Sequence, residues 1–265
     1  MSNVQELFVN PVYNALNDST LYCVPWYKVL CTKMRSVLNG GYAFTSKRAS
    51  RALELGCGTG IVSLLLAARE RFEHIDALEV QEIYASLAQR NVDLNAFGEQ
   101  IRVIHGDARA FPAKSDTGSY DAVFTNPPYM KTNAGAVCES EGKEIARHEH
   151  FGTIADFAAC AARALKWGGS FFCVYRPDRL TDLILACRES GLEPKRLCFV
   201  SAKASLAPSM VLLEARRGGN AGLFVTPPLI LRENEEDSAD YTELLAFGRL
   251  PEKFERKTPC QNSRK

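Results

Sequence analysis

Leu53-Glu54-Leu55-Gly56-Cys57-Gly58-Thr59-Gly60 is the stretch that decides the fold class of this chain. The apolar run Ala52–Leu55 predicts a strand and Ile61–Arg71 predicts a helix, so the three glycines connect the two. Glycines at such a connection let the backbone turn sharply and approach a ligand without interference from a Cβ. The stretch therefore predicts a ligand-binding loop after the first strand of an α/β sheet.

The spacing of the glycines, G-x-G-x-G, differs from the G-x-G-x-x-G of dinucleotide folds, where a pyrophosphate lies at the helix N-terminus. Glu54 disfavours a pyrophosphate and suits a cationic amino-acid group. S-adenosylmethionine carries such a group together with a ribose, and it is the cofactor that this loop favours. A glycine-rich turn without a ligand is the alternative. The predicted cofactor contacts of the loop are Glu54, Gly56, Cys57, Gly58 and Gly60.

Outward from the loop, short apolar runs alternate with amphipathic stretches, which is typical of a doubly wound α/β fold. We expect a Rossmann-like, mostly parallel seven-stranded sheet whose last two strands form an antiparallel hairpin at one edge. The expected strands are 52–55, 75–79, 101–104, 120–125, 170–175, 195–201 and 209–215, and the expected helices are 61–71, 83–95, 153–165 and 180–189. Gly168-Gly169 is the expected stop of the third helix.

Two acidic residues follow the next two strands. Glu79 ends the second strand, roughly 20 residues after the loop, where an acid can accept both ribose hydroxyls. Asp107 follows the third strand and could accept a hydrogen bond from an adenine amine. Val80 and Ala108, which come directly after these acids, complete the predicted cofactor site. A surface glutamate and an aspartate in a plain loop turn are the alternatives.

The sharpest signal follows the fourth strand, in Asn126-Pro127-Pro128-Tyr129. Two prolines fix φ twice and remove two backbone donors, so the remaining groups are acceptors: the Asn126 side-chain oxygen and the Pro127 carbonyl. A planar NH2 has two hydrogens to donate, and binding both orients its nitrogen for in-line attack on a methyl group. Tyr129 can stack on the target ring. We therefore predict a catalytic set of Asn126, Pro127, Pro128 and Tyr129, with Asn126 also near the cofactor.

The composition of the chain limits the partners and the cellular location that we expect. A formal net charge of +1 means that binding of nucleic acid would need a local basic patch. The nine cysteines are odd in number and contain no C-x-x-C pair, so neither a disulfide framework nor a metal site is expected, and reduced cysteines favour a cytosolic location. No apolar run is long enough to span a membrane. A monomer is assumed.

Three segments are expected along the chain. Residues 1–45 form an N-terminal extension of uncertain fold, residues 46–232 form the cofactor-binding domain, and residues 233–265 form a charged C-terminal segment. The uneven charge at both ends is typical of solvated surface, with a rim that contacts phosphates as the alternative.

The glycine loop together with Asn126-Pro-Pro-Tyr129 resembles the class I S-adenosylmethionine-dependent amino-methyltransferases. Further segments resemble the bacterial tRNA (adenine-N6) methyltransferases that act beside the anticodon of a valine tRNA: Ile145-Ala-Arg-His-Glu149, Ala164-Leu-Lys-Trp-Gly-Gly169, Arg176-Pro-Asp-Arg-Leu180, Leu192-Glu-Pro-Lys-Arg196 and Pro227-Pro-Leu229. The similarity runs from about Leu53 to Leu231. It implies methyl transfer to N6 of an adenine in tRNA.

The resemblance also implies substrate contacts. Tyr129 and Lys131 would lie at the target base, and Arg147 and His148 would meet RNA phosphate. An ion-paired helix start is the alternative for Arg147 and His148, with Glu144 and Glu149 as their partners.

Three other functions stay open. Release-factor glutamine methylation and guanine-N2 methylation of ribosomal RNA also use this kind of loop. The third is a non-catalytic RNA-binding paralogue. It is suggested by a departure from the family, because the G-F-R-F-x-x-D segment and the helix that usually precede the glycine loop are reduced here to Gly41-Tyr-Ala-Phe44.

Overall fold

The structure is a computed structural model that describes residues 49–127, 152–247 and 249–255. Its helices are α4 (Ile61–Ala68), α5 (Glu82–Leu94), α7 (Ile154–Ala164), α8 (Leu180–Glu189) and α9 (Ala239–Phe247). Its longer strands are β1 (Ala49–Leu55), β2 (Phe72–Glu79), β3 (Ile101–His105), β4 (Tyr120–Thr125), β5 (Leu165–Tyr175), β6 (Leu192–Ser201) and β7 (Met210–Arg217). Short strands follow: β8 (Phe224–Val225), β9 (Leu229–Ile230), β10 (Arg232–Glu233) and β11 (Glu236–Asp237).

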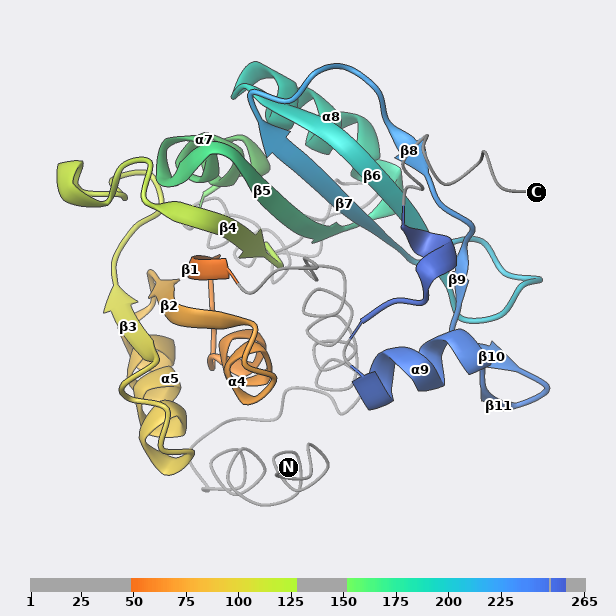
Figure 1. Ribbon diagram of the computed structural model, residues 1–265, viewed down its shortest axis with the longest axis horizontal. Coiled ribbons are helices and arrows are strands. Elements are labelled where there is room, and N and C mark those ends of the chain that lie inside the picture. The colour runs from red at the N-terminus through yellow and green to blue at the C-terminus, as the bar shows by residue number, and fades with distance from the viewer. Residues whose placement is uncertain (1–48, 128–151, 248, 256–265) are drawn as a thin grey trace, which may run out of the picture.

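One sheet organises the molecule, with strand order β3-β2-β1-β4-β5-β7-β6-β8 (Figure 1). Strands β1 to β5 pair in parallel, whereas β7 is antiparallel to both β5 and β6. The predicted mostly parallel sheet with an antiparallel hairpin is thus confirmed. The hairpin is not the outermost element, because β8 and β9 both pair with β6 and bring the sheet to nine strands.

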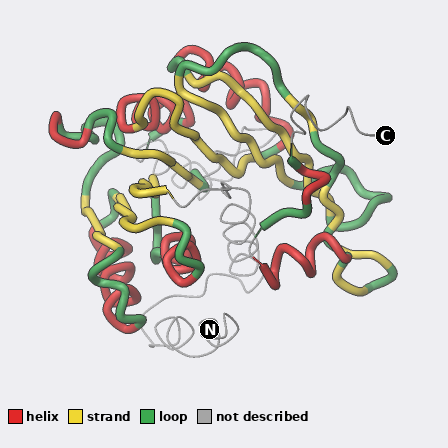
Figure 2. The backbone as a smooth tube through the Cα atoms, viewed as in Figure 1, coloured by secondary structure: helices red, strands yellow, loops and turns green. Residues whose placement is uncertain are grey.

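Helices cover both faces of this sheet (Figure 2). On one face, α4 and α5 bury an apolar cluster that also takes in Leu244 of α9 and Phe254, both 0% exposed. On the other face, α7 and α8 bury a second cluster that includes Phe157 and Leu183. The predicted boundary between the cofactor-binding domain and the C-terminal segment at residue 232 stays a prediction. Leu244 and Phe254, which follow it, pack into the same apolar cluster as α4.

Two boundaries differ from the sequence-based expectation. Helix α4 ends at Ala68 rather than Arg71, with Arg69 as its C-cap. Helix α7 ends at Ala164, and Gly168-Gly169 lies within β5 instead of stopping the helix. Leu165 already has extended backbone angles, so the helix stops three residues before the glycines are reached.

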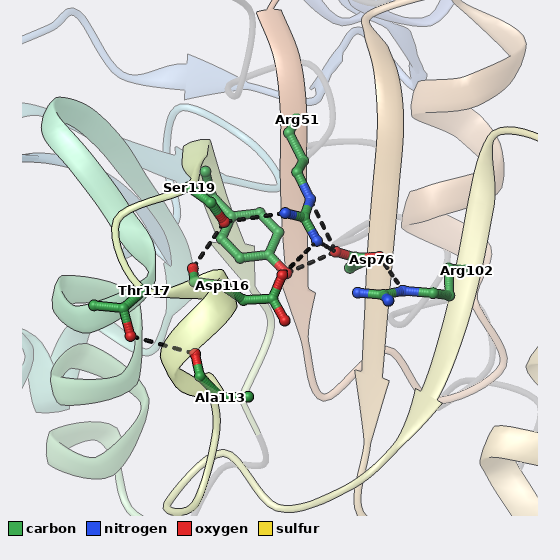
Figure 3. Close-up of polar contacts among 8 residues, drawn as sticks. Arg51, Asp76, Arg102, Ala113, Asp116, Thr117 and Ser119 are labelled. Atoms are coloured by element: carbon green, nitrogen blue, oxygen red, sulfur yellow. Dashed lines mark hydrogen bonds and ion pairs between the residues drawn. The ribbon is translucent and has the colours of Figure 1, made fainter.

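A polar cluster ties four neighbouring strands of the sheet together (Figure 3). The Asp76 carboxylate on β2 accepts from Arg51 Nη2 at 2.7 Å, Arg102 Nε at 2.7 Å and the Tyr120 hydroxyl at 2.6 Å. Arg51 Nη2 also donates to Asp116 at 2.8 Å. Burial alone would raise the pKa of Asp76, but these donors hold it below its ordinary value. The cluster joins β1, β2, β3 and β4 through one nearly buried carboxylate.

Among the described residues, no helix combines the length and the apolar character needed to cross a membrane.

Candidate active site at the carboxyl edge of the sheet

The two loops singled out in the sequence begin side by side. Leu55 at the end of β1 pairs with Thr125 at the end of β4, and the Thr125 hydroxyl donates to the Leu55 carbonyl at 2.8 Å. Gly56 and Asn126 follow these two residues directly. The chain reverses direction across the sheet at this point, since β2 and β3 lie on one side of β1 and β4 on the other. Such a switch point opens the crevice where ligands bind in α/β sheets.

The glycine loop has the backbone that its sequence predicts. Gly56, Gly58 and Gly60 all have positive φ, at 68°, 55° and 79°, a region that residues with a Cβ rarely adopt. The amides of Gly56 and Cys57 donate to the Leu78 carbonyl at 2.9 and 3.0 Å, which fixes the loop against β2. A Cβ placed on Gly58 would meet no atom within 4 Å, so the loop is open to a ligand on that side.

The Glu79 carboxylate binds the backbone of the loops after β1 and β2 through two amides. One carboxylate oxygen accepts from the Gly58 amide at 2.8 Å and the other from the Gln81 amide at 2.9 Å. Glu79 is only 5% exposed, yet it lies at the end of β2, where the sequence predicts an acceptor for ribose hydroxyls. In this structure the carboxylate holds the loop in shape.

Glu54 lies under the loop and is 4% exposed. Its carboxylate accepts from both the backbone amide and the hydroxyl of Ser63, and thereby satisfies a donor in the first turn of α4. Burial raises the pKa of Glu54 to about 8 despite these donors. Burial thus favours the neutral form of this carboxyl, and it neutralises a cationic group only after it has lost its proton.

Asp107 follows β3 at the same edge of the sheet. The Arg109 guanidinium donates to both of its oxygens, at 3.0 Å to Oδ1 and at 2.9 and 2.5 Å to Oδ2, and this lowers the pKa of Asp107. The loop around it is held from α7, because Arg163 Nη2 donates to the Ala108 carbonyl at 3.1 Å and the Phe111 carbonyl at 2.8 Å. Asp107 thus stays ionised and partly exposed beside the predicted cofactor site.

The catalytic loop is described up to Pro127. Asn126 is half-buried and Pro127 is buried, directly after the Thr125 anchor. The remaining predicted residues lie outside the described residues: Pro128, Tyr129, Lys131, Arg147 and His148. Val80 is half-buried, and its carbonyl lies 3.1 Å from His105 Nε2.

Sequence reasoning missed several residues that shape the site. Phe157 of α7 is 3% exposed and lies against Gly56, where an added Cβ would be 3.5 Å from its ring. The Asn91 side chain of α5 donates to the Thr59 carbonyl at 3.0 Å, which secures the far side of the loop. No local pattern marks these residues, because each contact joins positions at least 30 residues apart.

The described residues fit S-adenosylmethionine. The glycine loop has open space at Gly58. Glu79 at the end of β2 and Asp107 after β3 supply carboxylates at the same carboxyl edge of the sheet. An ionised carboxylate accepts about four hydrogen bonds, so hydroxyl and amine donors of a ligand can bind Glu79 and Asp107 in addition to the Gly58 and Arg109 donors.

Comparisons with known proteins agree with this geometry. A family model described as "Methyltransferase small domain" matches residues 42–185. A tRNA1(Val) (adenine(37)-N6)-methyltransferase of Tolumonas auensis is 32% identical over 62% of this chain and 68% of its own. Another, from Flavobacteriaceae bacterium, is 30% identical over 78% of this chain and 89% of its own. A predicted O-methyltransferase of Agrobacterium tumefaciens shares the fold, with a TM-score of 0.67 and 22% identity over 82% and 98% of the two chains.

Proposed function

Because the chain belongs to the methyltransferase small domain family and, through its relatives, to the tRNA1(Val) (adenine(37)-N6)-methyltransferases, we propose that it methylates N6 of adenine 37 in a valine tRNA. The cofactor is S-adenosylmethionine, which supplies a methyl group on a sulfonium. The observation that carries the proposal is the pairing of Leu55 with Thr125, because it starts the glycine loop and the Asn126 loop at one point of the sheet.

Each part of the cofactor has a partner in this arrangement. We assign the ribose hydroxyls to Glu79 and the adenine amine to Asp107, with Val80 and Ala108 beside the ring. The backbone of Gly56, Cys57, Gly58 and Gly60 would cradle the methionyl part. Glu54 accepts a hydrogen bond from Ser63 in the first turn of α4. Its proposed role is therefore to position the glycine loop and this helix for the cofactor.

The target base is held by acceptors. The Asn126 side-chain oxygen and the Pro127 carbonyl accept the two amine hydrogens, which turns the nitrogen lone pair toward the methyl group. The Thr125–Leu55 hydrogen bond fixes where these acceptors stand relative to the glycine loop. Proximity and orientation supply most of the rate enhancement, because the amine becomes acidic only as the new bond forms.

Roles further from the reacting atoms remain proposals. Tyr129 would stack on the base, with Pro128 stiffening the loop, and Lys131, Arg147 and His148 would contact the RNA. A cytoplasmic location goes with a tRNA substrate.

The test is transfer of radiolabelled methyl from S-adenosylmethionine to tRNA that lacks its native modifications. Wild type should yield labelled N6-methyladenosine, and Asn126→Ala should lower kcat by about 100-fold or more, as the loss of one positioned transition-state partner does. Asn220→Ala, at an exposed asparagine far from the crevice, is the matched control and should retain full activity.

Two outcomes would contradict the proposal in different ways. Label in ribosomal RNA or a release factor, with none in tRNA, would keep the reaction class and overturn the substrate. Binding of S-adenosylmethionine without transfer to any of the three would favour the non-catalytic paralogue.

A further inference from the structure

A second concave surface lies at the opposite edge of the sheet from the candidate active site. The pocket has a volume of about 730 Å³ and is formed by the ends of α7 and α8, the start of β5 and the end of β7. Among the residues that line it are Trp167, Arg163, Arg188, Arg217, Glu189 and Glu193. Apart from Arg163, which also holds the loop after Asp107, none of these residues has a role in the proposed methyl transfer. The pocket thus brings one exposed indole and three guanidinium groups to a single concave surface.

Trp167 is held out of the sheet by the backbone. Strand β5 advances from Leu165 to Ser170 while its partner β4 advances only from Tyr120 to Ala122, so residues 166–169 stand out of the ladder. The Trp167 side chain remains 80% exposed.

One edge of the indole rests on a glycine. A Cβ added to Gly218 would lie 2.2 Å from Trp167 Cζ2, so only a residue without a side chain leaves room for the ring there. Gly218 also has a φ of 64°, and its amide donates to the Gly191 carbonyl at 3.2 Å. The ring is therefore supported from beneath while most of its surface faces solvent. An exposed, supported ring of this kind is suited to stacking against a nucleobase.

The guanidinium groups around the indole are positioned by the backbone. Arg217 Nη1 donates to the Leu165 carbonyl, and Arg163 Nη2 donates to the Ala108 and Phe111 carbonyls. A guanidinium has five N–H donors, so each keeps donors beyond those bonds. The Arg188 side chain is 64% exposed, and its Nε lies 3.6 Å from the Glu193 carboxylate, a long ion pair whose arginine is open to solvent and to a phosphate.

From this geometry we propose that the pocket binds a nucleotide of the tRNA substrate, with its base stacked on Trp167 and its phosphate on Arg188 and Arg217. The inference rests on the proposed function, because it takes tRNA as the substrate. The pocket and the candidate active site lie at opposite ends of β4, which is roughly 17 Å long from Tyr120 to Thr125. The nucleotide in the pocket is therefore not the one that is methylated. The pocket would position the body of the tRNA while the target base occupies the other edge.

Fluorescence of Trp167 gives a direct test. The chain has two tryptophans, and Trp26→Phe leaves Trp167 as the only indole. Titration of this variant with unmodified valine tRNA should quench its emission. Adding Arg188→Ala should weaken binding at least five-fold and lower the slope of log affinity against log salt by about one. Arg232→Ala, which removes an exposed arginine outside the pocket, is the matched control and should change affinity less than two-fold.

Methyl transfer supplies a second readout in the full chain. Trp167→Ala should raise KM for tRNA about five-fold with kcat unchanged, and Trp167→Phe, which keeps an aromatic ring, should recover part of the loss. If tRNA is methylated but Trp167 emission does not change and KM is unaffected by Trp167→Ala, this inference fails while the proposed function stands. Quenching by AMP and not by tRNA would assign the pocket to a free nucleotide and would also overturn it. If tRNA is neither bound nor methylated, the proposed function itself has failed.

Discussion

Replacing Asp76 with asparagine tests whether the polar cluster holds the central strands together. The Asp76 side chain is 6% exposed and accepts hydrogen bonds from two arginines and a tyrosine. Asp76→Asn keeps the size of the side chain but removes its charge, so Arg51 and Arg102 lose the anion that they share. Breaking a buried ion pair by removing one partner costs roughly 3–5 kcal/mol.

The expected cost lies at the low end of that range. The Arg102 side chain is 58% exposed and that of Arg51 is 27% exposed, so water stabilises the two cations once Asp76 is neutral. Arg51 also keeps Asp116 as a partner. We therefore expect the free energy of unfolding to fall by about 3 kcal/mol, which corresponds to a Tm lower by roughly 6–12 °C for a chain of this size.

The assay is thermal unfolding followed by circular dichroism at several pH values. Because the pKa of Asp76 is lowered in the folded state, its contribution is present above its ordinary pKa and is lost as pH falls through the folded value. The difference in Tm between wild type and Asp76→Asn should therefore be full at pH 7 and shrink below about pH 4. Affinity for S-adenosylmethionine at 20 °C should stay within two-fold, since the cluster lies away from the carboxyl edge.

Asp116→Asn is the matched control. Asp116 contacts only Arg51 among the cations of the cluster, and its side chain is 20% exposed, so we expect a loss of about 1 kcal/mol. A Tm for Asp76→Asn within 2 °C of wild type at pH 7, or equal to that of Asp116→Asn, would refute the reasoning.

Three further variants probe the cofactor loop. Gly58→Ala should cost about 1–2 kcal/mol in stability, because position 58 has a positive φ. Its Cβ would enter the open space of the predicted cofactor site, so the Kd for S-adenosylmethionine should rise at least ten-fold in calorimetry. An unchanged Kd would argue against this site. The Tm of Glu54→Gln should rise relative to that of wild type as pH increases from 5 to 9. Burial raises the pKa of Glu54 in the folded state to about 8, so wild type loses stability as pH rises to and through that value. A Tm difference between the two proteins that does not change with pH would contradict this account. Phe157→Ala should lower stability by roughly 3–5 kcal/mol and loosen cofactor binding through Gly56, whereas Phe157→Leu should recover most of both; equal losses in the two would point away from packing.

Local sequence patterns were enough to predict the glycine loop, most of the strands and helices, and the edge at which two acidic residues lie. Three glycines between an apolar run and an amphipathic run permit a loop with positive φ, because the freedom to adopt this backbone lies within single residues. Alternation of apolar runs likewise placed β1 through β5 and their helices within a few residues. The acids at Glu79 and Asp107 could be placed at one edge because parallel strands end on the same side of a sheet.

Only the tertiary structure decided what those residues contact. That Glu54 reaches Ser63, that Asp76 collects donors from three other strands, and that Trp167 lies over Gly218 all depend on strand register and on packing between distant segments. The same holds for β8 and β9, which extend the sheet beyond the predicted hairpin. Periodicity along a chain specifies which face of a strand or helix is buried, but it carries no information about which distant segment covers that face.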